Sequence, residues 1–116
     1  MSKRSVIQLS EFNITQRIIE SLSNVCTRSV LFSVKNESKD VTQIANELKI
    51  SLSTVYKTLA TLEELALAEV DKYIISSEGK KIKLYRSRIG KVEITLDDLE
   101  PILHLYPNET TFDSAQ

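Results

Sequence analysis

Residues 41–65 read VTQIANELKISLSTVYKTLATLEEL, and this stretch decides the fold. A short helix is expected over residues 41–48, because its apolar residues recur at the steps that share one helical face. Residues 49–51 form a tight turn, and Ser51 is a good N-cap for a second helix over residues 52–65. The core-facing residues of the second helix are Val55, Leu59, Leu62 and Leu65.

Strand-forming sequence follows these helices. Residues 68–76 and 82–88 alternate as half-exposed strands do, and they flank a turn that contains one glycine, Gly79. We expect this basic hairpin to project as a wing, with residues 76–83 at its tip. Residues 92–96 alternate as a third short strand.

A last helix is expected near the C-terminus. Asp97 reads as its N-cap, Glu100 follows three residues later, and Pro101 falls in the first turn, where proline is tolerated. After Pro107 the chain has no apolar periodicity, so residues 107–116 are expected to form a flexible acidic tail.

Two helical patterns lie upstream. Over residues 11–23 the apolar residues Ile14, Ile18, Ile19 and Leu22 share one face. Asn24 is a plausible stop, and Thr27 can cap a helix that buries Val30, Leu31 and Val34. The pattern leaves open whether the two helices are separate or continuous. Residues 1–10 are expected to be flexible, and residues 11–106 form one domain.

Composition indicates an ordinary folded protein, because 41% of the 116 residues are hydrophobic and 27% are charged. No apolar run approaches the roughly 20 residues of a membrane span, and no apolar signal core follows Lys3 and Arg4. The lone cysteine, Cys26, cannot form an internal disulfide, which suits a reducing compartment. We therefore expect a cytoplasmic protein that does not associate with membranes.

Charge is unevenly distributed, although the net charge of the chain is only −1. Residues 71–92 carry seven basic and two acidic residues, which gives +5, whereas residues 93–116 carry six acidic and no basic residues, which gives −6. A basic stripe of this kind can bind phosphate locally while the totals cancel. The alternative is that the lysines only solvate an exposed sheet edge.

This arrangement is typical of DNA recognition. The major groove is about 12 Å wide and admits one helix, which must be rigid and braced by another. The helix over residues 52–65 presents hydroxyl groups near its start, and lysines on the hairpin can reach the flanking backbone. The expected DNA-binding residues are Thr42, Gln43, Ser51, Ser53, Thr54, Tyr56, Lys57, Thr61, Lys80, Lys81 and Lys83. For Tyr56, a partly buried packing role is the alternative.

Residues 44–65, with the run STVYKTLATLEEL at 53–65, resemble the winged helix-turn-helix of small prokaryotic repressors. The likeness is greatest to the ArsR-like group and weaker to regulators of the ferric-uptake type, and it covers roughly residues 27–88. It implies a bacterial or archaeal regulator that binds double-stranded DNA as a homodimer paired through terminal helices, here residues 12–22 and 99–105. The expected dimer residues are Ile14, Ile18, Leu22, Leu99 and Leu103.

The chain departs from that family's pattern at two points. Ala66 stands where glycine commonly follows the reading helix, so a left-handed C-cap there would be strained by about 1 kcal/mol unless the helix runs one turn further. The Cys-x-Cys pair of metal-sensing members is also missing, and Cys26 and His104 are single and far apart in sequence. We expect Cys26 to pack as a small apolar residue and His104 to pack or face solvent, with no bound metal.

The fold class expected is mostly α with a small β-hairpin wing (α+β), a winged helix-turn-helix with additional N-terminal and C-terminal helical segments. No Ser/His/Asp set or glycine-rich phosphate loop is present, so an enzyme and a cofactor are not expected. Two functions remain: a DNA-binding transcriptional regulator, or a winged-helix protein–protein interaction module of transcription machinery. The sequence does not identify the operator, a small-molecule effector, or whether the regulator represses or activates.

Overall fold

Local capping signals set where the helices begin and end in the computed structural model, which describes residues 14–110. Residues 14–23 are helical, and α2 spans Val25–Ser33. Asn24 separates them with an extended backbone, and its side chain accepts a hydrogen bond from the backbone N–H of Thr27 (3.0 Å). The two helices are therefore separate, and the cap is Asn24 rather than Thr27.

The helix-turn-helix pair is confirmed. Helix α3 spans Val41–Leu48 and begins with a capping box, in which Asp40 and Gln43 satisfy each other's backbone N–H groups. Helix α4 spans Leu52–Glu64 and is capped by Ser51, whose hydroxyl accepts from the backbone N–H of Thr54 (3.1 Å). Between them Lys49 adopts a left-handed conformation (φ 58°), which makes the turn tight.

Helix α4 ends at the position that the sequence marked as strained. Ala66 adopts φ 61°, in the left-handed region. Its N–H donates to the carbonyl of Glu63 (2.9 Å), and the N–H of Leu67 donates to the carbonyl of Leu62 (2.8 Å). This pair of bonds is a Schellman motif, which normally has glycine at the left-handed residue. The helix does not run one turn further.

The wing is an antiparallel hairpin of β1 (Ala68–Ile75) and β2 (Lys81–Ser87). Its register pairs Ile74 with Ile82 and shifts between Val70 and Lys72, where a bulge increases the local twist. Gly79 supplies the positive φ (83°) that the turn requires.

A second antiparallel hairpin, formed by β3 (Ile89–Thr95) and β4 (Ile102–Pro107), replaces the expected C-terminal helix. That prediction was wrong because local capping signals at residues 97–101 match a helix start, whereas strand pairing depends on distant residues. Val92 pairs with Leu105 and Ile94 with Leu103, so β3 gains a partner for one edge. Residues 97–100 form a turn, in which the Asp98 carboxylate accepts from the N–H of Leu99 (2.7 Å).

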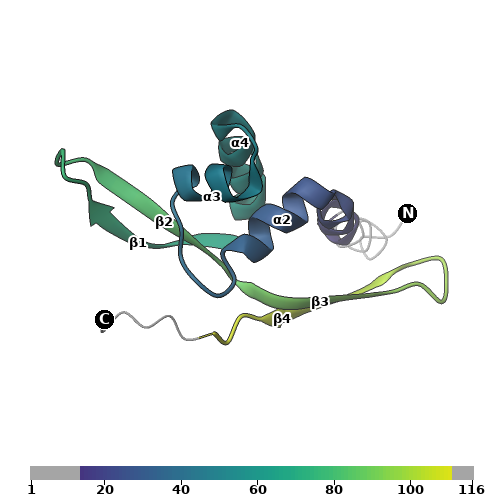
Figure 1. Cartoon of the computed structure of the whole chain (residues 1–116). Helices are drawn as coiled ribbons and strands as arrows, with labels where there is room; N and C mark the ends of the chain where they lie inside the picture. The colour runs from purple at the N-terminus through teal and green to yellow at the C-terminus, as the bar shows by residue number, and fades with distance from the viewer. Residues whose placement is uncertain (1–13, 111–116) are drawn as a thin grey trace, which may run out of the picture.

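One core joins the helices to the bases of both hairpins. Buried side chains from residues 14–23 and α2 to α4 meet Leu67, Ala68, Tyr85 and Ile89. The fully buried core residues include those expected on α2 (Val30, Leu31 and Val34) and on α4 (Val55, Leu59 and Leu62). Hairpins β1–β2 and β3–β4 extend away from this helical body toward opposite ends of the molecule (Figure 1), which measures 58 × 30 × 26 Å.

The chain beyond β4 is held at its start. The side-chain amide of Asn108 donates to the backbone carbonyls of Lys35 and Ser87 (2.9 Å each), and its backbone N–H donates to the carbonyl of Arg88 (2.8 Å). Within the expected flexible tail over residues 107–116, Asn108 is thus hydrogen-bonded to the body of the chain, and the flexibility of the tail stays a prediction. The remainder of that tail, residues 111–116, and the expected flexible N-terminus, residues 1–10, lie outside the described residues, as do residues 11–13 of the expected first helix.

Candidate nucleic-acid interface

The first turns of α4 present a polar, exposed surface. Ser53, Tyr56 and Lys57 are exposed, and Tyr56 keeps 57% of its surface accessible although packing was the alternative for it. The hydroxyls of Ser51 and Thr54 are hydrogen-bonded to each other (2.8 Å), so both residues serve the helix start. Thr61 lies further along, half-buried, and its hydroxyl donates to the carbonyl of Lys57 (3.3 Å).

The start of α3 lies beside this surface. Thr42 and Gln43 are both exposed. The side chain of Gln43 is engaged in the capping box with Asp40, where it accepts from the backbone N–H (3.0 Å). Thr42 makes no such contact with the part of the chain that the structure describes, and it lines a groove between the helices and the wing.

This groove brings together residues that are distant in the sequence. Thr42 and Tyr56 line its helical side, and Lys80, Lys81 and Lys83 line its wing side. Tyr85 lies at its base and is 6% exposed. Burial raises the pKa of the Tyr85 hydroxyl, and the negative charge of Glu63 raises it further, so the groove floor stays neutral at physiological pH. Five of the expected site residues thus share one concave surface, whereas three others line a separate hollow between α4 and the start of α2: Thr54, Lys57 and Thr61.

The sequence did not identify Tyr73 as a partner of the wing lysines. In the register of the hairpin Tyr73 pairs with Lys83 and Ile75 with Lys81, so these four side chains share one face. The Nζ atom of Lys81 lies 4.4 Å from the centre of the Tyr73 ring, a cation–π contact that orients the ammonium group. Pairing the two predicted strands about Gly79 would have placed these residues together.

Within the described residues, no ion pair joins Lys57, Lys80, Lys81 or Lys83 to a carboxylate, so their charge is available to a ligand. Other basic residues are used within the chain: Lys39 pairs with Glu47 and Arg17 with Glu64, each at 2.7 Å. The positive charge of these four lysines is therefore not balanced by an ion pair within residues 14–110, unlike that of Arg86 at the base of the wing.

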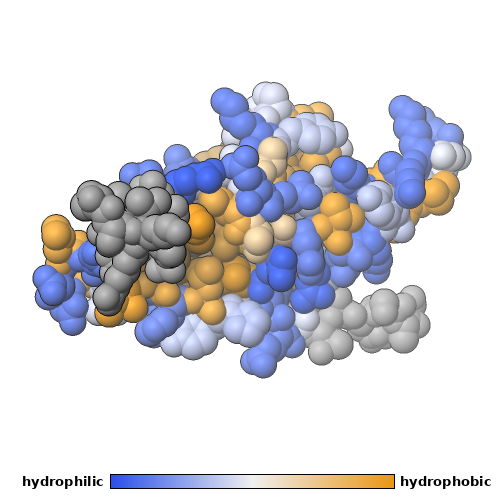
Figure 2. Space-filling model, turned by 180° about the vertical axis from the view of Figure 1, so that it is seen from behind, coloured by the Kyte–Doolittle hydropathy of each residue, from blue (hydrophilic) through white to orange (hydrophobic). Residues whose placement is uncertain are grey.

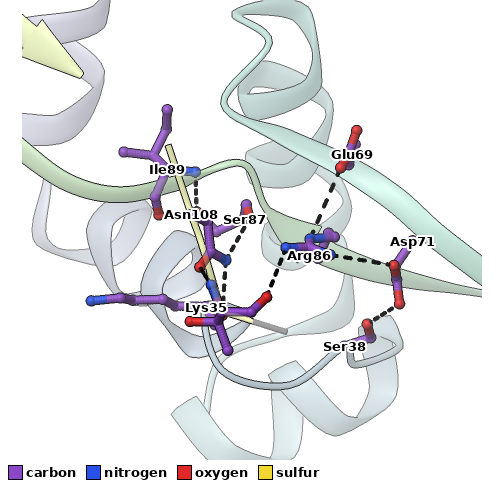
Figure 3. A network of polar contacts seen from close by, with 9 residues as sticks. Lys35, Ser38, Glu69, Asp71, Arg86, Ser87, Ile89 and Asn108 are labelled. Carbon is purple, nitrogen blue, oxygen red and sulfur yellow. Dashed lines mark hydrogen bonds and ion pairs between the residues drawn. The ribbon is translucent and has the colours of Figure 1, made fainter. Parts of the chain in front are cut away.

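A polar network fixes the base of the wing (Figure 3). Arg86 lies between two carboxylates of β1, 3.8 Å from Asp71 and 3.9 Å from Glu69, and its guanidinium also donates to the backbone carbonyl of Thr110 (3.4 Å). The second oxygen of Asp71 accepts from the hydroxyl of Ser38 (2.5 Å), in the loop before α3. The wing is thereby tied to both the helix-turn-helix and the C-terminal segment.

Backbone pairing supports this attachment. Lys39 and Tyr85 exchange two backbone hydrogen bonds, 3.1 and 2.8 Å long, immediately before the Asp40 cap of α3. The groove between α3 and the wing therefore has walls that are joined by hydrogen bonds at their base. Rigid presentation of this kind is what a reading helix and its flanking wing require.

No group of three or more His, Cys, Asp and Glu side chains in residues 14–110 could hold a metal ion. Cys26 is half-buried with a free thiol, and His104 lies on β4 with its ring edge-on to Tyr106, 6.4 Å between centres. No helix among the described residues is long and apolar enough to cross a membrane.

The residues expected at a dimer interface lie in different environments. Ile18 and Leu22 are 6% and 5% exposed, so they complete the core of their own chain. Ile14 is 56% exposed. Leu99 lies in the turn between β3 and β4 and is 90% exposed, whereas Leu103 lies on β4 and packs partly against the core. The structure does not bring these five residues onto one surface.

Comparison with known proteins bears on the whole helix-turn-helix and the start of β1. A family model described as bacterial regulatory protein, arsR family, matches residues 28–70. An uncharacterized HTH-type transcriptional regulator of the archaeon Methanocaldococcus jannaschii is 33% identical over 90 residues, which cover 78% of this chain and 90% of the relative.

Proposed function

Because the chain belongs to the arsR family of regulatory proteins and is a DNA-binding transcriptional regulator, we propose a role for each part of its surface. Helix α4 reads the major groove, and the wing contacts the flanking DNA backbone. The observation that carries this proposal is the groove that joins Thr42 and Tyr56 to the three wing lysines. A duplex seated against α4 would place one of its strands along that groove.

The exposed residues of α4 divide into two roles. Ser53 and Tyr56 carry hydroxyl groups on the outer face of the first turns, where base edges come closest to a helix in the major groove. Lys57 lies beside them and supplies a cation for a phosphate. Ser51 and Thr54 act by fixing the helix start, because the Ser51 hydroxyl accepts from the backbone N–H of Thr54 and bonds its hydroxyl; the Ser53 hydroxyl lies 3.1 Å from that of Ser51.

The wing lysines supply affinity rather than sequence preference. Lys80, Lys81 and Lys83 are exposed, and they face phosphates on the far side of the groove from Thr42. Each phosphate contact releases a condensed counterion, so the logarithm of the binding constant falls with the logarithm of salt concentration by about 0.9 for each contact. The chain is enzymatically inactive in this proposal, and no cofactor takes part.

Selection of bound fragments from random duplex DNA tests the proposal, followed by mobility-shift titrations at several salt concentrations. Replacing Lys57, Lys80, Lys81 and Lys83 by glutamine should abolish retention of the selected fragment at moderate salt. Lys81→Gln and Lys91→Gln form a matched pair, because both lysines are exposed and both lie over a tyrosine ring. Only Lys81→Gln should weaken binding. Equal binding by both single variants, together with retention by the fourfold variant, would contradict the proposal.

We further propose that the regulator acts as a homodimer on a near-palindromic site. Two reading helices about 34 Å apart would then enter successive major grooves on one side of the duplex. The mass of the complex on a selected fragment checks this stoichiometry. One copy for each fragment, with a single conserved half-site, would refute it.

A further inference from the structure

The β3–β4 hairpin has one apolar and one polar face. Strand register places Val92, Ile94, Leu103 and Leu105 on one face. The opposite face carries Lys91, Glu93, His104 and Tyr106, with Thr95 and the exposed Ile102 at its outer end. The polar face is internally bonded: the Tyr106 hydroxyl donates to Glu93 (2.7 Å), and Lys91 lies 3.4 Å from the same carboxylate. The polar face thus faces solvent, and the apolar face is the one that requires cover.

The helical body covers only part of the apolar face. Val92 and Leu103 pack against the core, whereas Ile94 is 42% exposed and Leu105 is 37% exposed. Beyond the last strand pair, Leu96 is 73% exposed and Leu99 is 90% exposed. A two-stranded hairpin is marginally stable in water unless its apolar face packs on something. The exposed aliphatic side chains at the outer end of this hairpin therefore mark an interaction surface.

A largely apolar hollow lies beside the same hairpin. It is lined by Ile19, Leu22 and Phe32 from the first two helices and by Val92 and Ile94 from β3, with Arg28 at its rim. The guanidinium of Arg28 donates to the backbone carbonyls of Leu22 and Ser23 (2.8 and 3.0 Å), which fixes its charge at the end of the first helix. Figure 2 shows the molecule from behind, with apolar side chains gathered in the middle and others at the left end.

We propose that a second copy of this chain docks on the β3–β4 hairpin, with the hairpin tip of each copy seated at the hollow of the other. A two-fold interface must be self-complementary, so one chain must carry both the projecting and the receiving part. Leu96 and Leu99 project at the tip, the hollow receives, and Ile94 lies between the two parts.

Charge complementarity selects a second copy as the occupant. The tip carries three exposed carboxylates, Asp97, Asp98 and Glu100, and no ion pair engages them within residues 14–110. The hollow carries the cation Arg28 at its rim. Antiparallel packing of two hairpins places each acidic tip beside the arginine of the other copy, and the two-fold axis repeats the contact.

The proposed assembly leaves the DNA-binding surface free. The wing extends from the helical body toward the end opposite the β3–β4 hairpin (Figure 1), so docking at the hairpin leaves both wings at the outer ends of the dimer. The proposed dimer forms without DNA. The inference rests on the proposed function only in that the dimer would bind a symmetric DNA site.

Sedimentation equilibrium of the full chain without DNA tests the surface directly. Leu96→Glu with Leu99→Glu should raise the dissociation constant of the dimer at least about 100-fold, because four unpaired charges enter a buried interface. Both leucines are exposed in the single chain, so the fold should survive, which circular dichroism checks. Ile75→Glu on the wing is the matched control, since Ile75 is 67% exposed at the opposite end, and it should leave the dimer unchanged. A leucine variant that dimerises as the unsubstituted chain does, or an unsubstituted chain that stays monomeric, would overturn the proposal.

A charge exchange provides a second measurement. Arg28→Glu alone, and Asp97→Lys with Asp98→Lys alone, should each weaken the dimer, and the three changes together should restore it. Restoration cannot arise from a structural role of either group, and its absence would overturn the charge pairing proposed here. Failure of this inference is distinct from failure of the proposed function: a monomeric hairpin variant should still bind a single half-site, and a wing variant that loses DNA should still dimerise.

Discussion

Replacing Ala66 by glycine should stabilise the protein, although the substitution removes a methyl group. Ala66 is exposed, so the methyl group contributes little to packing. It is held at φ 61°, a conformation that costs a residue other than glycine about 1–2 kcal/mol. Glycine avoids that cost but gains freedom in the unfolded chain, which offsets about 0.5–1 kcal/mol. The two bonds of the Schellman motif are made by backbone groups and remain.

The free energy of unfolding should therefore rise by about 0.5–1 kcal/mol, and the melting temperature by roughly 2–6 °C for a domain of this size. Urea denaturation followed by circular dichroism measures the first quantity, and a thermal scan measures the second. Ala60→Gly is the matched control, because Ala60 is exposed within α4 and the same substitution there should cost about 1 kcal/mol. If Ala66→Gly lowered stability as Ala60→Gly does, the account of the α4 terminus would be refuted.

Three further predictions follow from other contacts. Tyr106→Phe should raise the pKa of Glu93 toward its ordinary value, because the Tyr106 hydrogen bond is the largest cause that lowers this pKa. The bond favours folding above the ordinary pKa of Glu93, and its contribution is lost as pH falls through the lowered pKa. In an NMR titration of the Glu93 carboxyl carbon the midpoint should shift upward in the variant, and an unmoved midpoint would count against the contact. Asn108→Ala should cost about 1–3 kcal/mol of unfolding free energy, since the carbonyls of Lys35 and Ser87 lose their shared donor, and a loss below the error of a urea titration would show that residues 107–110 are not anchored. Leu59→Ala should cost about 2–5 kcal/mol in the same assay, because Leu59 is 1% exposed in the core, and a neutral result would place α4 differently.

Short-range signals predicted most of the helix-turn-helix and the wing. The stripe of Val55, Leu59 and Leu62, the helix cap Ser51 and the turn residue Gly79 each act on residues close to them in the sequence, so their patterns are visible there. The predicted α4 reached Leu65, whereas the helix ends at Glu64. The left-handed conformation of Ala66 remained one of two alternatives, because a helix C-terminus depends on where the following strand must begin.

The C-terminal hairpin could not be predicted in the same way. Asp97, Glu100 and Pro101 provide local signals for a helix start, and they compete with pairings such as Val92 with Leu105, which join residues far apart in sequence. The pairings prevail because an unpaired β3 would leave its backbone groups without partners along both edges. The site behaves similarly: its residue types were visible, but the contact between Lys81 and Tyr73 required the strand register.

Strands β2 and β3 are separated by a bend at Arg88 alone, so two nearly consecutive strands supply one strand of each hairpin. Side chains alternate along such strands with a period of two. Inserting or deleting one residue at this junction would turn the leucines of the β3–β4 hairpin outward, while the wing lysines would stay in place. Either hairpin can therefore lengthen at its turn during evolution, whereas the junction between β2 and β3 tolerates changes in length only in steps of two residues.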